Sequence, residues 1–344
     1  MKLGVGLAGG LAAVALLVLA IILGNRLGAG LLHQDQQPRT QLTVRIDTAA
    51  VPQTVVRTLF GTVRDGMREP RIGFASIAPS GDSIEVTVLD GVDRAQALAR
   101  LRELSRPPGS TGGAETEMFT IADAPGAVLR LTPTPAALAE GVARAVDQTI
   151  DVLDRRIDSL RLKPTFNREG DDRIVIEVPR QPDTTRLKEF IVTPGKLAFR
   201  FVDESMRVEE AKGGRMPPES EILQDQKGVP YLVEKRISMS GESLLDAQAN
   251  FDQRTDQPVV NFRFNAAGTR QFARMTGEKV GAPFAVVLDG VVLAAPVIRE
   301  PILGGSGQIS GNITVESANN LAILLRSGAL PAPLTIIGER TIEP

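Results

Sequence analysis

Residues 134–178, TPAALAEGVARAVDQTIDVLDRRIDSLRLKPTFNREGDDRIVIEV, decide the fold class of this chain. Their first part predicts one long helix, because Thr134 is a suitable N-cap, Pro135 fits the first helical position, and apolar residues follow at helical spacing. That apolar stripe consists of Leu138, Val142, Val146, Ile150, Leu153, Ile157 and Leu160. The second part predicts strands at 165–168 and 173–178, where apolar and polar residues alternate. A long helix followed by a hairpin is typical of α+β folds with antiparallel sheets.

Similar patterns lie on both sides of this stretch. Upstream, the periodicity predicts a strand at 42–46, a helix at 51–63 and a hairpin around the turn at 79–82. Pro70 then aligns with Pro164 and Asp93 with Asp183, an offset close to 90 residues. We interpret this as a weak duplication of a split β-α-β unit.

The downstream part begins with a polar segment, residues 203–240, that we expect to be an irregular insertion. A third unit follows it. Strands are predicted at 284–288 and 291–297, joined by Asp289-Gly290, which is a strong hairpin turn. Thr314 is the expected N-cap of a last helix, which Gly328 ends.

The N-terminus carries an apolar run. Leu3 to Asn25 holds no charged residue, and a helix of that length spans the hydrocarbon core of a bilayer. We expect one retained transmembrane helix, with the bulk of the chain outside the cytoplasm. The alternative is a cleaved secretory signal, although the run is longer than such a signal requires.

The composition of the chain excludes most kinds of catalytic and metal-binding site. The 344 residues include no cysteine and only one histidine, His33. Sites that need a cysteine thiolate or a group of histidine side chains are therefore not expected. The 39 basic and 41 acidic residues give a net charge of −2, which argues against nucleic acid as a partner. The loop at 304–307 is glycine-rich but lacks the lysine of a phosphate loop, so a flexible turn or the lip of a cleft is expected. We predict no catalytic, cofactor-binding or metal-binding residue.

Two blocks of sequence carry a family resemblance. The first is RRIDSL at 155–160 with KPTF at 163–166 and GDDRIVIEVP at 170–179. The second contains FAVVLDG at 284–290, APVIREPI at 295–302, GGSGQISG at 304–311 and LRSGALPAPL at 325–334. Together they resemble the first periplasmic domain of the SecD protein-export family.

The resemblance implies ferredoxin-like βαββαβ units in a base and a head subdomain, preceded by one transmembrane helix. The expected divisions are a membrane anchor at 1–32, a tether at 33–41, a first ferredoxin-like unit at 42–122, a base at 123–195, a head at 196–330 and a final strand at 331–344 that returns to the base.

It also implies a role without enzyme activity or cofactor. The protein would sit in the bacterial inner membrane as a single-pass protein, and its periplasmic head would bind or help to pull unfolded preproteins beside SecF and a SecYEG-type channel. The alternative is a scaffold that docks on the channel or on SecF without touching clients.

Particular residues follow from the resemblance. The expected client-binding surface comprises Phe284, Val286, Leu288, Val297, Ile298, Gly304, Gly305, Ser306 and Gly307. The expected structural residues of the family motif are Arg156, Asp158, Pro164, Asp172 and Arg173.

Three departures from the family pattern stand out. The glycine motif that usually precedes the first strand is absent from 37–42, and Arg161 occupies a position that is usually glycine. The chain ends at Pro344, where the family continues into further membrane helices. We therefore expect either a truncated subunit or a stand-alone paralogue, and the lost glycine motif favours the paralogue.

Overall fold

The computed structural model describes residues 38–68, 72–88, 94–106, 117–311 and 313–343. The expected anchor at Leu3–Asn25 lies outside these ranges. Within them, no helix has both the length and the apolar character needed to cross a bilayer. The α+β class with mainly antiparallel sheets is confirmed.

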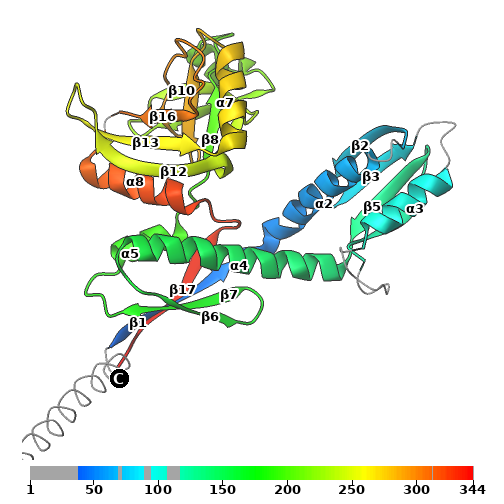
Figure 1. Cartoon of the computed structure of the whole chain (residues 1–344), viewed down its shortest axis with the longest axis horizontal. Coiled ribbons are helices and arrows are strands. Elements are labelled where there is room, and N and C mark those ends of the chain that lie inside the picture. Colours follow the sequence, from blue (N-terminus) through cyan, green and yellow to red (C-terminus); the bar gives the residue numbers. More distant parts are fainter. Residues whose placement is uncertain (1–37, 69–71, 89–93, 107–116, 312, 344) are drawn as a thin grey trace, which may run out of the picture.

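The first sheet forms the base. Its strand order is β17 (Leu334–Ile342), β1 (Arg39–Ile46), β7 (Arg173–Pro179) and β6 (Thr165–Glu169), and every neighbouring pair is antiparallel. Helices α4 (Pro135–Ser159) and α5 (Thr185–Val192) cover one face of it (Figure 1). In chain order the elements are β1, α4, β6, β7, α5 and β17. The alternation predicted for β7 puts Ile174, Ile176 and Val178 in the core beneath α4.

The first strand does not pair with the hairpin that follows it. We expected a unit at 42–122 to start with this strand, but Leu42 lies opposite Ile176 in β7 and Glu339 in β17. Alternation fixes which face of a strand is buried, and it does not identify the partner strand. The two segments offset by 90 residues therefore do not form two sheets with the same arrangement of strands along the chain.

The described residues between 47 and 134 form an inserted lobe with its own core. Its sheet has the order β2 (Phe74–Ser80), β3 (Ser83–Val88), β5 (Val128–Pro133) and β4 (Phe119–Ala124). Helices α2 (Val51–Arg68) and α3 (Arg94–Leu104) pack with it, and the short helix η1 (Thr48–Ala50) precedes α2. Helix α4 joins both units: Ala137 belongs to the lobe core and Ile157 to the base core (Figure 1).

The head lies between α5 and β17 in the chain. One of its sheets has the order β10 (Pro230–Glu234), β9 (Ser220–Asp225), β15 (Val291–Ala294), β14 (Phe284–Leu288), β8 (Leu197–Phe201) and β11 (Met239–Ser240). A second has the order β12 (Leu244–Phe251), β13 (Pro258–Phe264) and β16 (Ser306–Ile309). Helices α7 (Ala266–Glu278) and α8 (Val315–Ser327) complete it, with short turns α6 (Val208–Glu210), η3 (Ala211–Arg215) and η4 (Gly241–Ser243).

The head core is aromatic. The rings of Phe199, Phe262, Phe264, Phe272 and Phe284 pack with centroids 5.1–6.4 Å apart. The segment 203–240 was expected to be irregular, yet it supplies β9, β10 and β11. Short strands in a polar stretch bury few side chains, so their alternation is weak in the sequence.

Candidate functional site at the junction of base and head

The chain crosses between base and head at two places, residues 193–196 and 327–330, and both crossings meet Arg156. This arginine belongs to the Arg155-Arg156 pair near the end of α4. Arg156 follows Val152 by one helical turn, so it shares the buried face of the helix, and it is 0% exposed. Arg155 is exposed, and its guanidinium donates to the carbonyl of Ser327 (2.8 and 3.1 Å) from outside the buried cluster.

Every partner of the Arg156 guanidinium is an oxygen of an uncharged group. Its N–H groups donate to the carbonyls of Phe190 (2.7 Å), Thr193 (2.5 Å), Pro194 (3.1 Å) and Gly328 (3.1 Å) and to the hydroxyl of Ser327 (3.3 Å). A guanidinium has five N–H donors in a planar fork, and all three of its nitrogens are used here.

These acceptors belong to the C-terminal ends of two helices. Phe190 and Thr193 end α5 in the base, while Ser327 and Gly328 end α8 in the head. The last carbonyls of a helix lack intrahelical partners and carry partial negative charge, so a cation placed there is stabilised. Burial lowers the pKa of Arg156 to about 10; Asp289 partly opposes that shift, and Arg155 adds to it. Arg156 is therefore charged at neutral pH, and it holds both helix ends.

Asp289 fastens the first crossing from the side of the head. Its carboxylate accepts hydrogen bonds from the backbone N–H of Gly195 (3.0 Å) and of Lys196 (2.8 Å). Asp289 lies in the predicted two-residue turn between β14 and β15, and its φ of 50° and the φ of 84° at Gly290 suit that turn. Gly195 must be glycine, since its φ is 75° and a Cβ atom would lie 2.8 Å from Nη2 of Arg156. We call Arg156, Asp289 and residues 193–196 and 327–328 the base–head joint.

The other residues of the family motif lie away from this joint. Asp158 is exposed near the end of α4, and Pro164 is half-buried before β6. Asp172 forms ion pairs with Arg45 (3.5 Å) and Arg173 (3.8 Å) at the edge of the base sheet. Of the five motif residues, the structure places only Arg156 at the joint.

Part of the expected client-binding surface is buried. Phe284, Val286 and Ile298 are at most 5% exposed, and Leu288 packs against the same core. The reason is that β14 is an inner strand with side chains packed on both faces, which alternation alone does not reveal. Phe284, Val286 and Ile298 therefore cannot contact a client in this fold, and the prediction for these three is wrong, whereas Leu288 is half-buried.

The remaining residues of that surface are Val297, whose backbone pairs with Pro283, and residues 304–307, which lead into β16. Val297 is 55% exposed, and Gly304 and Ser306 are exposed. The glycines serve close packing: a Cβ on Gly305 would lie 2.1 Å from Oγ1 of Thr269, and one on Gly307 would lie 2.5 Å from the ring of Phe262. The expected flexible loop is thus tightly fitted. Sequence reasoning missed Leu303, which is 72% exposed beside this loop.

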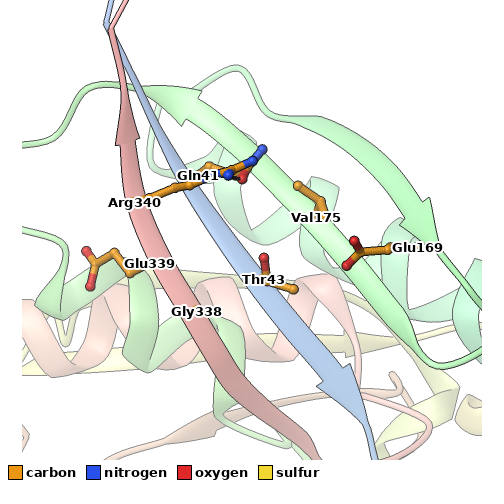
Figure 2. A pocket seen from close by; sticks show the side chains of 7 residues that line it. All are labelled: Gln41, Thr43, Glu169, Val175, Gly338, Glu339 and Arg340. Carbon is orange, nitrogen blue, oxygen red and sulfur yellow. Dashed lines mark hydrogen bonds between the residues drawn. The ribbon is translucent and has the colours of Figure 1, made fainter.

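The base sheet has a polar face opposite its helices. Arg340 of β17 donates to Oε1 of Gln41 in β1, and Nε2 of Gln41 donates to Glu177 in β7 at 2.9 Å. Beside this ladder lies a shallow depression of about 280 Å³, where Gly338 leaves space next to Thr43 (Figure 2). In the part of the chain that is described, no group of acidic or histidine side chains could hold a metal ion.

Comparison with known proteins gives matches in both head and base. Residues 220–332 match the family model of the SecDF P1 head subdomain, and residues 146–204 match that of the N-terminal part of the P1 domain of protein translocase subunit SecDF. The protein translocase subunit SecD of Rickettsia bellii is 36% identical over 311 residues, which are 90% of this chain and 58% of the relative. The SecD subunit of Rhodobacter capsulatus is 36% identical over 319 residues, covering 90% of this chain and 56% of the relative.

Two solved structures are also similar. One comes from work on SecDF, a membrane component that enhances protein export; it is 33% identical, has a TM-score of 0.48, and covers 58% of this chain and 94% of its own. The other is SecDF in its super-membrane-facing form, which is 25% identical with a TM-score of 0.49 and covers 86% of this chain and 35% of its own. The chain thus spans a little over half the length of the curated relatives.

Proposed function

Because the chain belongs to the SecD family of protein translocase subunits, we propose that it serves bacterial protein export as an accessory subunit without enzyme activity. In this proposal the head contacts unfolded polypeptides during export and the base carries the head. The residues at 3–25 would anchor the chain in the inner membrane, with the head and base in the periplasm beside SecF and a SecYEG-type channel.

One observation carries the proposal: the two segments that match the family models, residues 146–204 and 220–332, contact each other at the buried Arg156. The model of the P1 domain covers Arg156, and the model of the head covers Ser327 and Asp289. The order of the base elements, β1-α4-β6-β7-α5-β17 with sheet order β17-β1-β7-β6, supports a ferredoxin-like base into which head and lobe are inserted.

Within the head, we propose that clients meet the surface around β16. This strand bonds to β13 on one side and is the edge of its sheet on the other. An edge strand offers backbone groups to an extended chain, and Leu303, in the loop that leads into β16, adds exposed apolar area.

Co-purification tests the export role. The full chain would be isolated from cells in which a secreted protein is stalled in the channel by a folded C-terminal domain, and the control would be the same secreted protein without its signal sequence. We expect the stalled protein to co-purify and the control to be absent. Equal recovery of both, or recovery of neither, would contradict the proposal.

A scaffold role is the second candidate, and the polar face of the base sheet favours it. Gln41, Glu177 and Arg340 form a hydrogen-bonded surface on which no helix of the described chain packs. Deletion of residues 205–330 distinguishes the two roles. If the chain is a scaffold, the deletion variant should still co-purify with SecF or the channel, and the recovery of the stalled protein should not change. If the head binds clients, the deletion variant should no longer recover the stalled protein.

A further inference from the structure

Helix α3 and strand β4 of the inserted lobe are fastened together at both ends. At one end, Oγ of Ser105 donates to the carbonyl of Phe119 (2.7 Å) and accepts from its N–H (3.1 Å). At the other end, Arg94 forms a hydrogen-bonded ion pair with Asp123. The two elements therefore run side by side with a fixed separation.

Strand β4 is an edge of its sheet, and its outward backbone groups follow from the register. Phe119 lies opposite Pro133, which has no N–H, and its own N–H and C=O turn outward to Ser105. Outward groups recur at every second residue of a strand, so those of Ile121 and Asp123 face the same side. In the described chain no backbone or side-chain group bonds to these outward atoms.

A hollow of about 350 Å³ lies between the two fastenings. Leu98 of α3 and Ile121 of β4 line it and also pack against the lobe core, which gives it a small apolar floor, while the larger part of its lining, including Thr120, is polar. Arg102, Glu117 and Asp123 supply charged groups of both signs at its rim. The hollow thus combines an open strand edge, an apolar floor and a helical wall.

We propose that this hollow binds an extended segment of an unfolded polypeptide, which adds to β4 as a further strand. Two outward N–H and C=O pairs at Ile121 and Asp123 would match a segment of about three residues, given a rise of about 3.3 Å per residue. Ser105 already makes at Phe119 the bonds that such a strand would make. The inference rests on the proposed function, because an export subunit meets unfolded chains.

A second copy of this chain is a poorer occupant. In every copy Ser105 already bonds the outward groups of Phe119, so two β4 edges could pair only over Ile121 and Asp123, a short contact for joining two whole lobes. An extended segment of about three residues needs no more than those two positions. Self-association through β4 is therefore an outcome for the experiment to exclude.

Fluorescence anisotropy of the full chain tests the proposal with a labelled eight-residue peptide of alternating serine and valine. The comparison peptide carries N-methyl groups on alternate amides, which removes hydrogen bonds and keeps the side chains. We expect saturable binding of the first peptide and binding at least about tenfold weaker of the second. Equal binding of the two peptides would overturn strand addition.

Leu98→Arg, which fills the hollow, should weaken binding of the unmodified peptide by about tenfold, whereas Ala99→Arg, at an exposed neighbouring position of α3, should leave it within about twofold. If both variants bind as the parent does, the site is elsewhere and the inference fails. Sedimentation at the same concentrations would show whether β4 edges pair with each other, a result that also contradicts it.

The stalled-chain co-purification separates this inference from the export role. Recovery of the stalled protein together with unchanged peptide binding in Leu98→Arg would overturn the hollow and leave the export role standing. Peptide binding that depends on Leu98, without recovery of any stalled protein, would overturn the export role alone.

Discussion

Arg156 and Asp289 bind the same peptide group of the first crossing, the one that joins Pro194 to Gly195. Nη2 of Arg156 donates to the carbonyl of Pro194 at 3.1 Å, and the carboxylate of Asp289 accepts from the next N–H groups, those of Gly195 and Lys196. One residue belongs to the base and the other to the head. The first crossing is therefore fixed from both sides, and Arg156 also reaches the second crossing at Ser327 and Gly328.

Replacing Arg156 should loosen this joint. Arg156→Met keeps a long apolar side chain but removes the donor from the carbonyls of Phe190, Thr193 and Gly328, whereas the carbonyl of Pro194 keeps the N–H of Leu330 (2.8 Å). Unsatisfied buried groups cost about 1 to 3 kcal/mol each, so we expect a loss of about 3 kcal/mol or more in the free energy of unfolding, measured by urea titration.

The neighbouring arginine supplies the control. Arg155 is exposed and donates to a single acceptor, the carbonyl of Ser327, within the described residues, so Arg155→Met should cost about 1 kcal/mol. Spin labels on head and base should also give a broader distance distribution in Arg156→Met than in Arg155→Met. Equal losses in the two variants would contradict the special role of Arg156.

Arg161 occupies a strained position at the end of α4. Its φ is 61°, its N–H donates to the carbonyl of Asp158 (2.8 Å), and the N–H of Leu162 donates to that of Ile157 (3.3 Å). This is the Schellman arrangement, in which glycine is favoured because the left-handed conformation burdens other residues. Arg161→Gly should raise the free energy of unfolding by about 1 kcal/mol after the entropy of the unfolded chain is counted. A decrease in thermal stability would contradict this reading.

The glycine loop before β16 should tolerate change at one position and not at the next. A methyl group on Gly305 would overlap Thr269 of α7, so Gly305→Ala should cost about 2 to 3 kcal/mol. Gly304→Ala meets only Oγ of Ser306 at 3.9 Å and should cost less than about 1 kcal/mol. Chemical denaturation of both variants gives the comparison, and similar small costs would show that the loop is mobile after all.

Acid should weaken the connection between β16 and the loop that precedes β13. The hydrogen bond from Gln308 (3.2 Å), with those from the backbone of Thr255 and Arg254, holds the pKa of Asp252 well below its ordinary value of 3.8. A lowered pKa in the folded state means that this stabilisation is present above pH 3.8 and is lost as the pH falls below it.

Asp252→Asn tests that dependence. Thermal unfolding followed from pH 6 to pH 2.5 should show a smaller loss of Tm in the variant than in the parent chain. Asp256→Asn removes the same charge from the same loop and should keep the parent's dependence. Parallel curves for the parent and Asp252→Asn would count against the contribution of Asp252.

Helix caps, turns and helix ends could be predicted from the sequence because residues close together in the chain determine them. Thr314 forms the predicted N-cap, with a capping box to Ser317, and Asp289-Gly290 makes the predicted turn. The predicted helix beginning at Pro135 ends at Ser159, as its apolar stripe implies. Caps, turns and apolar spacing act over a few residues, so one sequence suffices to find them.

Strand pairing over long distances in the chain, and the burial that results from it, could not be predicted from the sequence. Leu42 has the alternation of a buried strand residue, but nothing local names Ile176 and Glu339 as its neighbours. Phe284 and Val286 look like surface candidates until β14 is found inside a sheet covered on both faces. Arg156 was expected as a structural residue from the family resemblance, and its burial agrees with its place one turn after Val152 on the buried face of α4.

Photocrosslinking from Ser306 tests the central claim, that the head meets the exported chain, most directly. A photoreactive residue would replace exposed Ser306 in the full chain, and a matched one would replace exposed Asp154 on α4, in cells that hold a stalled secreted protein. The account predicts adducts with the secreted protein from position 306 and few from position 154. Adducts from neither position, or equal yields from both, would contradict it.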